Sequence, residues 1–274
     1  MRRLFDLGLA LALGIALAFL LLPILALFLR VSPGTLFAQL GSSVARDALW
    51  VSVKTGLIAH AFVVGLGTPA AYLLGTRRFR GRGLLLTAIE LPLVLPPAVA
   101  GIALITVFGR RGLLGGTLEA AGVTVSLTQA AVVLAVAFVA SPFYLRQAVE
   151  AFAAVDRTLL DASRTLGAGS FRTFRRVALP LAAGGLGAGS VLAWARGTGE
   201  FGATIMFAGS LRGQTQTLPL AIYAQLDQDQ TVAIAIGALL VLVSLVVLLS
   251  VKLLPSWTRS GSGWPTPFAR SASR

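Results

Sequence analysis

Residues 150–180 read EAFAAVDRTLLDASRTLGAGSFRTFRRVALP, and they separate two long apolar stretches. This connection is longer than an ordinary one between neighbouring helices. Gly167 and Gly169 predict the end of a first helix, and Ser170 is placed to cap a second one. We therefore expect two short helices with a tight bend. The first helix is indicated by apolar residues at helical spacing, which are Leu159, Leu160, Ala162 and Leu166.

On both sides of this segment the chain has stretches long enough to cross a membrane. A helix needs about 20 residues to span a hydrocarbon layer of roughly 30 Å. Six stretches meet this length, so both ends of the chain are expected on the same side. The six predicted spans are residues 7–29, 55–76, 83–109, 123–145, about 177–206, and 230–251.

The composition excludes several classes of protein. Of the 274 residues 56% are hydrophobic and only 12% are charged, and the mean hydropathy is +0.86. A soluble domain carries roughly a quarter charged residues. The chain is therefore predicted to be an all-α integral membrane protein, and not a soluble enzyme or a disordered tail. It has no cysteine, and His60 is its single histidine, so thiolate metal sites and thiol nucleophiles are excluded.

The formal charge of +13 is distributed between the apolar stretches and does not form one stripe. With the amino terminus in the cytoplasm, sixteen basic residues fall in cytoplasmic segments and six outside, with Arg196 left out because it lies inside a span. Cytoplasmic loops of membrane proteins carry an excess of Lys and Arg. The charge pattern therefore predicts an N-in, C-in orientation and no role in nucleic-acid binding.

The loop at 150–180 resembles the E-A-A-x3-G-x9-I-x-L-P loop of ABC importer permeases. The chain has DAS at 161–163, glycine at 167 and VALP at 177–180, so every spacing matches and three residue types differ conservatively. In that family the loop docks into a groove on the ATP-binding subunit. The resemblance implies that the contact is made by Asp161, Ala162, Ser163, Arg164, Leu166, Gly167 and Ala168.

The chain has no site of its own for ATP. The phosphate-binding pattern G-x-x-x-x-G-K-[ST] is missing, and neither lysine follows a glycine. The resemblance therefore implies that ATP and Mg²⁺ are bound by a separate ATPase, and that this chain has no catalytic, cofactor-binding or metal-ligating residues.

A second resemblance concerns the substrate. Residues 195–204 read ARGTGEFGAT and residues 213–223 read GQTQTLPLAIY, and both are similar to segments of oxyanion permeases, especially those for molybdate. Hydroxyl and backbone N–H groups suit an anion. A translocation path and gate are therefore expected at Arg196, Thr198, Gly199, Glu200, Gly202 and Thr204, with an external gate at Thr217, Leu218 and Pro219.

The fifth span has a pair of opposite charges and a pair of glycines. Arg196 and Glu200 are four residues apart, so on one helix they would share a face and neutralise each other. Gly185 and Gly189 have the spacing of small residues that lets membrane helices pack backbone to backbone. This helix is therefore expected to pack centrally.

Several alternatives remain open at this stage. The substrate could be sulfate or thiosulfate, or tungstate in place of molybdate. A stand-alone secondary anion transporter could use Glu90, His60, Arg196 or Glu200 as ion sites. Glu90 is more simply a carboxylate at a helix start, and His60 a packed interior histidine. A helix-turn-helix in the loop, a signal peptide before residue 30 and a membrane-embedded enzyme are less favoured.

Together these observations predict six transmembrane helices of the molybdate/sulfate-type permease fold in the cell membrane. A single permease domain is expected over residues 1–254 and a short cytoplasmic tail over residues 255–274. The expected partners are a second copy of the chain, two ATP-binding subunits, an external substrate-binding protein and the lipid bilayer.

Overall fold

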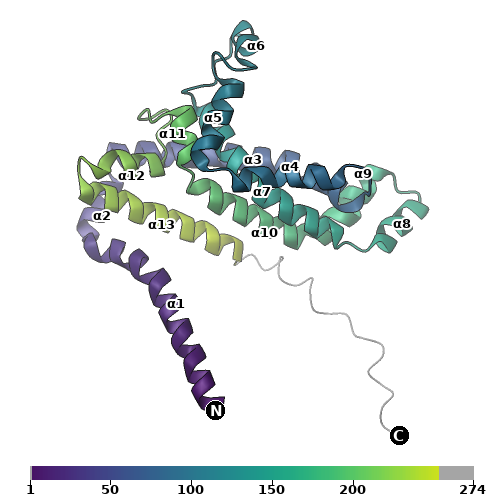
Figure 1. Ribbon diagram of the computed structural model, residues 1–274, viewed down its shortest axis with the longest axis horizontal. Helices are drawn as coiled ribbons and strands as arrows, with labels where there is room; N and C mark the ends of the chain where they lie inside the picture. The colour runs from purple at the N-terminus through teal and green to yellow at the C-terminus, as the bar shows by residue number, and fades with distance from the viewer. Residues whose placement is uncertain (1, 253–274) are drawn as a thin grey trace. The chain divides into compact units, whose positions relative to one another are not determined.

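The computed structural model describes residues 2–252, and this part of the chain is helical and contains no strand (Figure 1). The predicted tail at residues 255–274 lies outside the described residues. The helices are α1 (Arg2–Arg30), α2 (Pro33–Leu40), α3 (Ser43–Thr76), α4 (Arg82–Val94), α5 (Pro97–Phe108), α6 (Gly115–Ala120), α7 (Gln129–Ala153), α8 (Arg157–Thr165), α9 (Ser170–Thr173), a π-helical turn (Phe174–Ala178), α10 (Leu179–Thr198), α11 (Gly202–Ala208), α12 (Leu218–Leu226) and α13 (Gln230–Lys252).

Within the described residues, five helices are long and apolar enough to cross a membrane, and a sixth span results if the bent pair α4 and α5 counts as one. The five are Phe5–Arg30, Ser43–Thr76, Gln129–Ala153, Ser170–Thr198 and Gln230–Leu249. The all-helical membrane architecture is confirmed. The first and last predicted spans are close to the observed helices α1 and α13.

The third predicted span, residues 83–109, is not one continuous helix. It is divided into α4 and α5, which meet at a bend of 115°. Leu95 is extended with ψ 131°, because a residue before proline is driven out of the helical region. Pro96 is also extended, and Pro97 begins α5, where its missing N–H leaves no hydrogen bond unmade. The two successive prolines therefore end one helix and begin the next.

The second and fourth predicted spans have different boundaries in the structure. Helix α3 begins at Ser43 and not at residue 55, because scattered charges at an exposed helix end do not stop the helix. Helix α7 begins at Gln129, after a turn in which Leu127 has a φ of 61°. It continues past residue 145 to Ala153, and Arg146 and Glu150, one turn apart in this extension, pair at 3.7 Å.

The fifth span also differs from its prediction at both ends. Its helix starts at Ser170, runs through the π-helical turn and ends at Thr198. The second short helix expected in the loop is thus the beginning of this span. Residues 199–201 are not helical, so Glu200 lies beyond the end of α10. The prediction that Arg196 and Glu200 share one helix face was therefore wrong.

The chain divides into two compact units, each assembled from separate stretches of sequence. The first unit comprises Met1–Ala59, Pro96–Val136 and Thr198–Val246. The second comprises His60–Leu95, Ala137–Gly197 and a C-terminal part that starts at Val247. The single permease domain expected over residues 1–254 remains a prediction.

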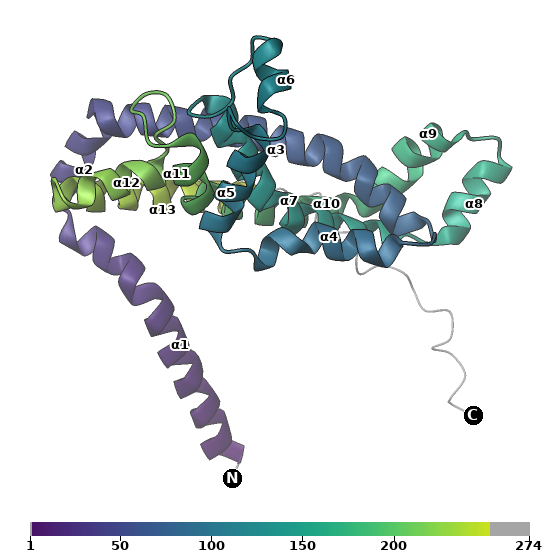
Figure 2. The same ribbon diagram turned by 45° about the horizontal axis from the view of Figure 1, so that its top comes forward.

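In the first unit, α3, α12 and α13 pack through small and branched side chains. Ser52 of α3 fixes the start of α12, because its hydroxyl accepts a hydrogen bond from the Leu218 N–H at 2.8 Å. Helix α11 lies against α5, as Figures 1 and 2 both show. The buried cluster of this unit consists of Ala45, Ala48, Leu218, Ala221, Ile236 and Leu239.

In the second unit, α10 packs tightly on α7, as the small residues predicted. A side chain at Gly185 would overlap the Cβ of Ala151. A Cβ at Gly189 would lie 2.9 Å from the Cβ of Gln147 and 3.1 Å from the Tyr144 carbonyl oxygen. The backbones of the two helices can approach only because these positions are glycine.

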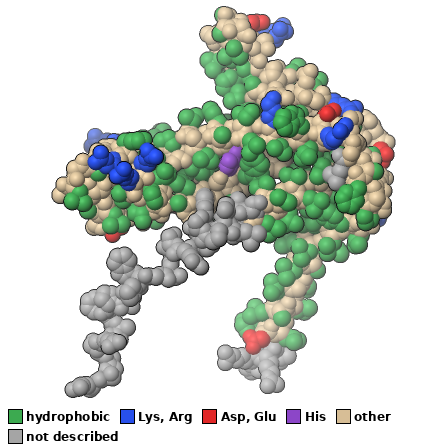
Figure 3. All heavy atoms as spheres, turned by 180° about the vertical axis from the view of Figure 1, so that it is seen from behind, with side chains coloured by type: hydrophobic (Ala, Val, Ile, Leu, Met, Phe, Trp, Pro, Cys, Tyr) green, Lys and Arg blue, Asp and Glu red, His purple; other side chains and the backbone are tan. Residues whose placement is uncertain are grey.

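The surface is largely apolar. Figure 3 shows hydrophobic side chains spread over the face in view. The most hydrophobic window of α1 has no buried residue at all, and large side chains such as Leu57 and Phe62 of α3 are exposed. Exposed apolar surface of this extent is expected for a protein whose solvent is lipid.

Candidate functional site

The loop between α7 and α10 begins with a capped helix. The Asp156 carboxylate accepts a hydrogen bond from the Thr158 N–H at 2.9 Å, which caps α8. This bond from the backbone, aided by the Thr158 side chain, lowers the pKa of Asp156 below its ordinary value. Leu160 anchors the helix with only 3% of its surface exposed. The local sequence therefore holds α8 in place at its start and along its inner face.

The bend after α8 is a Schellman motif. Gly167 has a φ of 82°, a conformation that L-residues with a side chain rarely adopt. Its N–H bonds to the Arg164 carbonyl at 2.9 Å, and the Ala168 N–H bonds to the Ser163 carbonyl at 3.1 Å. These two bonds satisfy carbonyls that the helix end leaves unpaired. The predicted stop at Gly167 is confirmed, while the cap of α9 is Gly169 and not Ser170.

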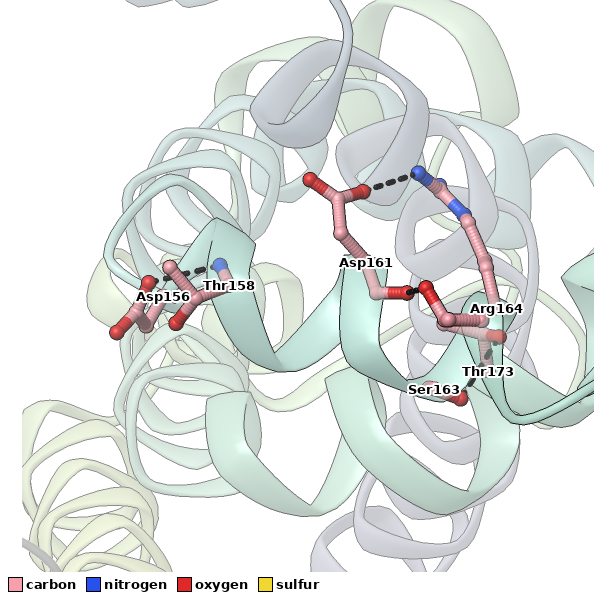
Figure 4. A network of polar contacts seen from close by, with 7 residues as sticks. Asp156, Thr158, Asp161, Ser163, Arg164 and Thr173 are labelled. Carbon is pink, nitrogen blue, oxygen red and sulfur yellow. Dashed lines mark hydrogen bonds and ion pairs between the residues drawn. The ribbon is translucent and has the colours of Figure 1, made fainter.

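Polar contacts hold α8 beside α9 (Figure 4). The Ser163 hydroxyl is hydrogen-bonded to that of Thr173 at 3.1 Å, and Thr173 is completely buried. Asp161 pairs with Arg164 at 2.9 Å, and the Thr165 hydroxyl donates to the Asp161 carbonyl at 3.0 Å. The ion pair is on the surface and contributes little stability. The Ser163–Thr173 hydrogen bond, in contrast, joins the two helices.

Helices α8 and α9 form a hairpin, and its outer side presents apolar side chains to solvent. Leu166 is 87% exposed, and Phe171 is 73% exposed. A groove runs beside them, and Ala162, Ser163 and Arg172 are among the residues that line it. Exposed apolar side chains next to a groove are typical of a surface that docks on a partner. All seven residues predicted to contact the ATPase lie on α8 and its C-terminal bend.

The predicted path residues are divided by the end of α10. Arg196 lies in the last turn of α10 and belongs to the second unit, and the others belong to the first. Glu200 is buried, and its carboxylate accepts a hydrogen bond from the Ala203 N–H in the first turn of α11 at 2.8 Å. The other predicted positions here are Thr198 at the helix end, Gly199 in the break, and Gly202 and Thr204 on α11.

Two of the predicted threonines have hydroxyl groups without a partner. The hydroxyls of Thr204 and Thr217 are buried, and within the described part of the chain neither has a hydrogen-bond partner. A buried unpaired hydroxyl costs free energy unless something binds it. Leu218 is completely buried, and Pro219 is partly buried at the start of α12. Thr204 and Thr217 are therefore the two predicted positions whose hydroxyl groups are left without a partner by the described residues.

The family of the chain follows from its sequence over most of its length. A family model described as "Binding-protein-dependent transport system inner membrane component" matches residues 67–260. The chain belongs to this family. It is therefore an inner-membrane transport permease and not an enzyme, as the loop motif predicted.

Individual relatives and solved structures agree with this family. The permease is 43% identical to the molybdenum transport system permease protein ModB of Mycobacterium tuberculosis. The match extends over 235 residues and covers 86% of this chain and 89% of that protein. The permease is 35% identical over 221 residues to the sulfate transport system permease protein CysW of Synechococcus elongatus, covering 80% and 77%. A bacterial alginate ABC transporter, solved with an alginate-bound periplasmic protein, has the same fold with a TM-score of 0.71 at 16% identity, over 91% of this chain and 93% of that one.

The alternative ion sites have ordinary structural roles in the permease. Glu90 lies in the middle of α4, not at its start, and faces Arg146 at 3.9 Å. The His60 Nε2 is 2.7 Å from the Ser190 hydroxyl, and its ring contacts Trp194 edge-on at 5.3 Å. Among the described residues no group of three or more His, Cys, Asp or Glu could hold a metal ion.

The sequence missed the buried groups behind the loop. Thr173 carries the contact to α8, and the rings of Phe152 and Phe174 lie close to each other. The only sequence signal was the helical spacing of Phe171 and Phe174, which did not reveal that one ring is exposed and the other packed inward. Contacts between residues far apart in the sequence can be identified only in the folded structure.

Proposed function

We propose that this chain is the membrane-spanning subunit of an ATP-driven importer for molybdate or tungstate. The observation that carries the proposal is the 43% identity to a molybdenum permease over 86% of the chain. The TLPL stretch at residues 217–220, where α12 begins, supports it from the sequence side. The second candidate is a sulfate or thiosulfate permease, which the 35% identity to a sulfate permease favours more weakly.

The proposed transporter contains two copies of this chain, two ATP-binding subunits that hold ATP and Mg²⁺, and an external substrate-binding protein. Each copy has six spans, with α4 and α5 as one broken span, and both of its ends are in the cytoplasm. The excess of basic residues in the cytoplasmic segments supports this orientation. With this orientation, α8 and the bend at Gly167 would lie on the side where the ATP-binding subunits are expected.

The docking surface in this proposal is α8 with the seven predicted residues from Asp161 to Ala168. ATP binding would close the ATP-binding subunits and displace the hairpin of α8 and α9. Helix α10 would transmit the displacement because it belongs to the same span as α9, to which the π-helical turn joins it. The Leu166 side chain supplies apolar contact, and the Ser163–Thr173 bond keeps the hairpin rigid enough to transmit force.

The translocation path in this proposal passes Thr204 and Thr217 of the first unit. The other predicted gate positions are Thr198, Gly199, Glu200 and Gly202 of the same unit and Arg196 of the second. A tetrahedral oxyanion has only acceptor oxygens, so it needs donors such as hydroxyl and N–H groups. The buried hydroxyls of Thr204 and Thr217 are donors of this kind. Glu200 does not present a bare carboxylate to the anion, because its carboxylate accepts a hydrogen bond from the Ala203 N–H. Leu218 and Pro219 would close the path on the external side.

We expect Thr204→Val to lower molybdate uptake without destabilising the protein. Valine has nearly the shape of threonine, and removing an unpaired buried hydroxyl is neutral or stabilising. Uptake should fall by about tenfold, the effect of losing roughly 1.4 kcal/mol of anion binding. The measurements are molybdate uptake into proteoliposomes and thermal unfolding of the purified complex.

The matched control is Thr55→Val. Thr55 is also a buried threonine in a span, but its hydroxyl already donates to the Val51 carbonyl at 2.6 Å. Uptake by this variant should stay near that of the wild type. If Thr204→Val transports normally, the hydroxyl of Thr204 does not contact the anion and the proposed path is wrong at this point.

The direct test of the proposed function is ATP hydrolysis by the complex in liposomes. The complex is purified with its ATP-binding subunit, and the binding protein is added with molybdate, tungstate or sulfate. Stimulation by molybdate or tungstate is expected. Stimulation by sulfate alone would transfer the substrate to the second candidate. Anion transport in the absence of any ATP-binding subunit would contradict the importer class itself.

A further inference from the structure

Three aromatic rings meet where the loop joins the membrane helices. Tyr72 of α3 lies 4.8 Å from Phe174, the first residue of the π-helical turn, measured between ring centroids. Tyr72 also lies 5.3 Å from Phe152 of α7, edge-on, and Phe152 lies 6.2 Å from Phe174. The three rings form an aromatic clamp that consists of Tyr72, Phe152 and Phe174. All three belong to the second unit.

The clamp is rigid on the side of α3 and α7. Phe152 is 1% exposed, and Gly75 of α3 allows it to approach. A Cβ at Gly75 would lie 2.8 Å from both the Cβ of Phe152 and the carbonyl oxygen of Val149. Aromatic contacts at these separations stabilise the packing beyond the area they bury. Tyr72 and Phe152 therefore form a fixed seat, and Phe174 is the ring that the loop brings to it.

Phe174 is also where the helix leaves α-helical geometry. The Leu179 N–H bonds to the Phe174 carbonyl, five residues earlier, which defines a π-helical turn. Pro180 explains this turn, because proline has no N–H and its ring would clash with the carbonyl of Arg176 in a regular helix. The wider turn moves that carbonyl aside. The Leu-Pro sequence thus creates an irregular joint between α9 and α10.

The joint is connected directly to α8. Thr173, which immediately precedes Phe174, is completely buried and bonded to Ser163 of α8. Two successive residues therefore contact different helices. Thr173 contacts α8, and Phe174 contacts α3 and α7. A change of the wide turn to α-helical geometry would shift the hairpin relative to α10 by one residue, about 100° of rotation and 1.5 Å of rise.

We propose that Phe174 is a positioning residue for energy coupling, which seats the π-helical joint in the aromatic clamp so that displacement of the α8 hairpin moves α3, α7 and α10 together. Without the ring, the hairpin can still dock, but its movement is absorbed in the irregular turn. This inference rests on the proposed importer function, because it assigns a route from the docking surface to the spans.

The test compares Phe174→Ala with the wild type in the complete complex, in proteoliposomes with the molybdate-loaded binding protein. The ATP-binding subunit should co-purify as before, and hydrolysis without the binding protein should persist. The number of molybdate ions transported per ATP should fall about tenfold, within the range for residues along a coupling route. Phe174→Tyr retains the ring and should restore the ratio. Tyr72→Ala should lower the ratio as well, and the double variant should be no worse than either single one.

The control is Phe62→Ala, which removes an equally large ring from α3 where it is 48% exposed and outside the clamp. Its transport per ATP should equal that of the wild type. An unchanged ratio for Phe174→Ala would overturn the proposal. Loss of co-purification in both Phe174→Ala and the less drastic Phe174→Leu would overturn it too, because Phe174 would then serve folding or docking. Failure of the proposed function is recognised separately, as a wild-type complex that molybdate does not stimulate.

Discussion

Replacing Gly101 by alanine should abolish molybdate uptake by forcing α11 away from α5. A Cβ at this position would lie 2.6 Å from the Cβ of Met206, 2.9 Å from the Ala203 carbonyl oxygen and 3.1 Å from the Ala203 Cα. Two of these atoms are backbone, so no side-chain rotation relieves the overlap. The cost of overpacking is about 1–3 kcal/mol or more. Because α11 carries Thr204 and its first turn is hydrogen-bonded to Glu200, its displacement disturbs the proposed path itself.

The measurement is thermal unfolding of the purified protein together with uptake in proteoliposomes. Gly65→Ala is the matched control, because nothing lies within 4 Å of a Cβ at that position in α3. Alanine is a better helix former than glycine by about 1 kcal/mol, so this variant should be as stable as the wild type or more so. Equal unfolding temperatures for both variants would show that α11 does not pack on α5 as closely as the structure has it.

The sequence predicts the continuous spans well and the broken ones poorly. Helix α13 matches its prediction to within one residue, because it is an uninterrupted apolar run between a polar start and Lys252. Residues 83–109 were predicted as one span, because two successive prolines do not by themselves indicate a bend of 115°. The end of α10 at Thr198 was missed, because no proline marks it and apolar residues continue beyond Glu200.

The candidate site shows the same division between local and distant information. The bend at Gly167 is encoded locally, by one glycine at the end of a helical repeat, and the sequence predicts it. The contact between Ser163 and Thr173 and the seat of Phe174 on Tyr72 join different helices. The partner of each residue is decided by packing and not by spacing. A single sequence therefore predicts the docking surface but not the joint behind it.

Replacing Gly167 by valine should uncouple the permease from its ATP-binding subunit. At a φ of 82° a side chain costs about 1–2 kcal/mol, and a β-branched one is the least tolerated. The Schellman motif would open, and Leu166 and Ala168 would leave the positions proposed to dock. Co-purification of the ATP-binding subunit should fall about tenfold, and molybdate-stimulated hydrolysis with it. Gly167→Asn should be nearly normal, because asparagine tolerates the left-handed conformation.

Gly169 is the control that separates backbone geometry from bulk. It lies in the same bend with a φ of −64° and a ψ of 163°, values that valine adopts readily, and nothing lies within 4 Å of an added Cβ. Gly169→Val should therefore retain docking and stimulated hydrolysis. If it is as damaging as Gly167→Val, any added volume on this face blocks the partner, and the left-handed glycine is not what positions the hairpin. If Gly167→Val alone fails while the isolated permease keeps its unfolding temperature, the defect lies in the bend and in its contact with the ATP-binding subunit.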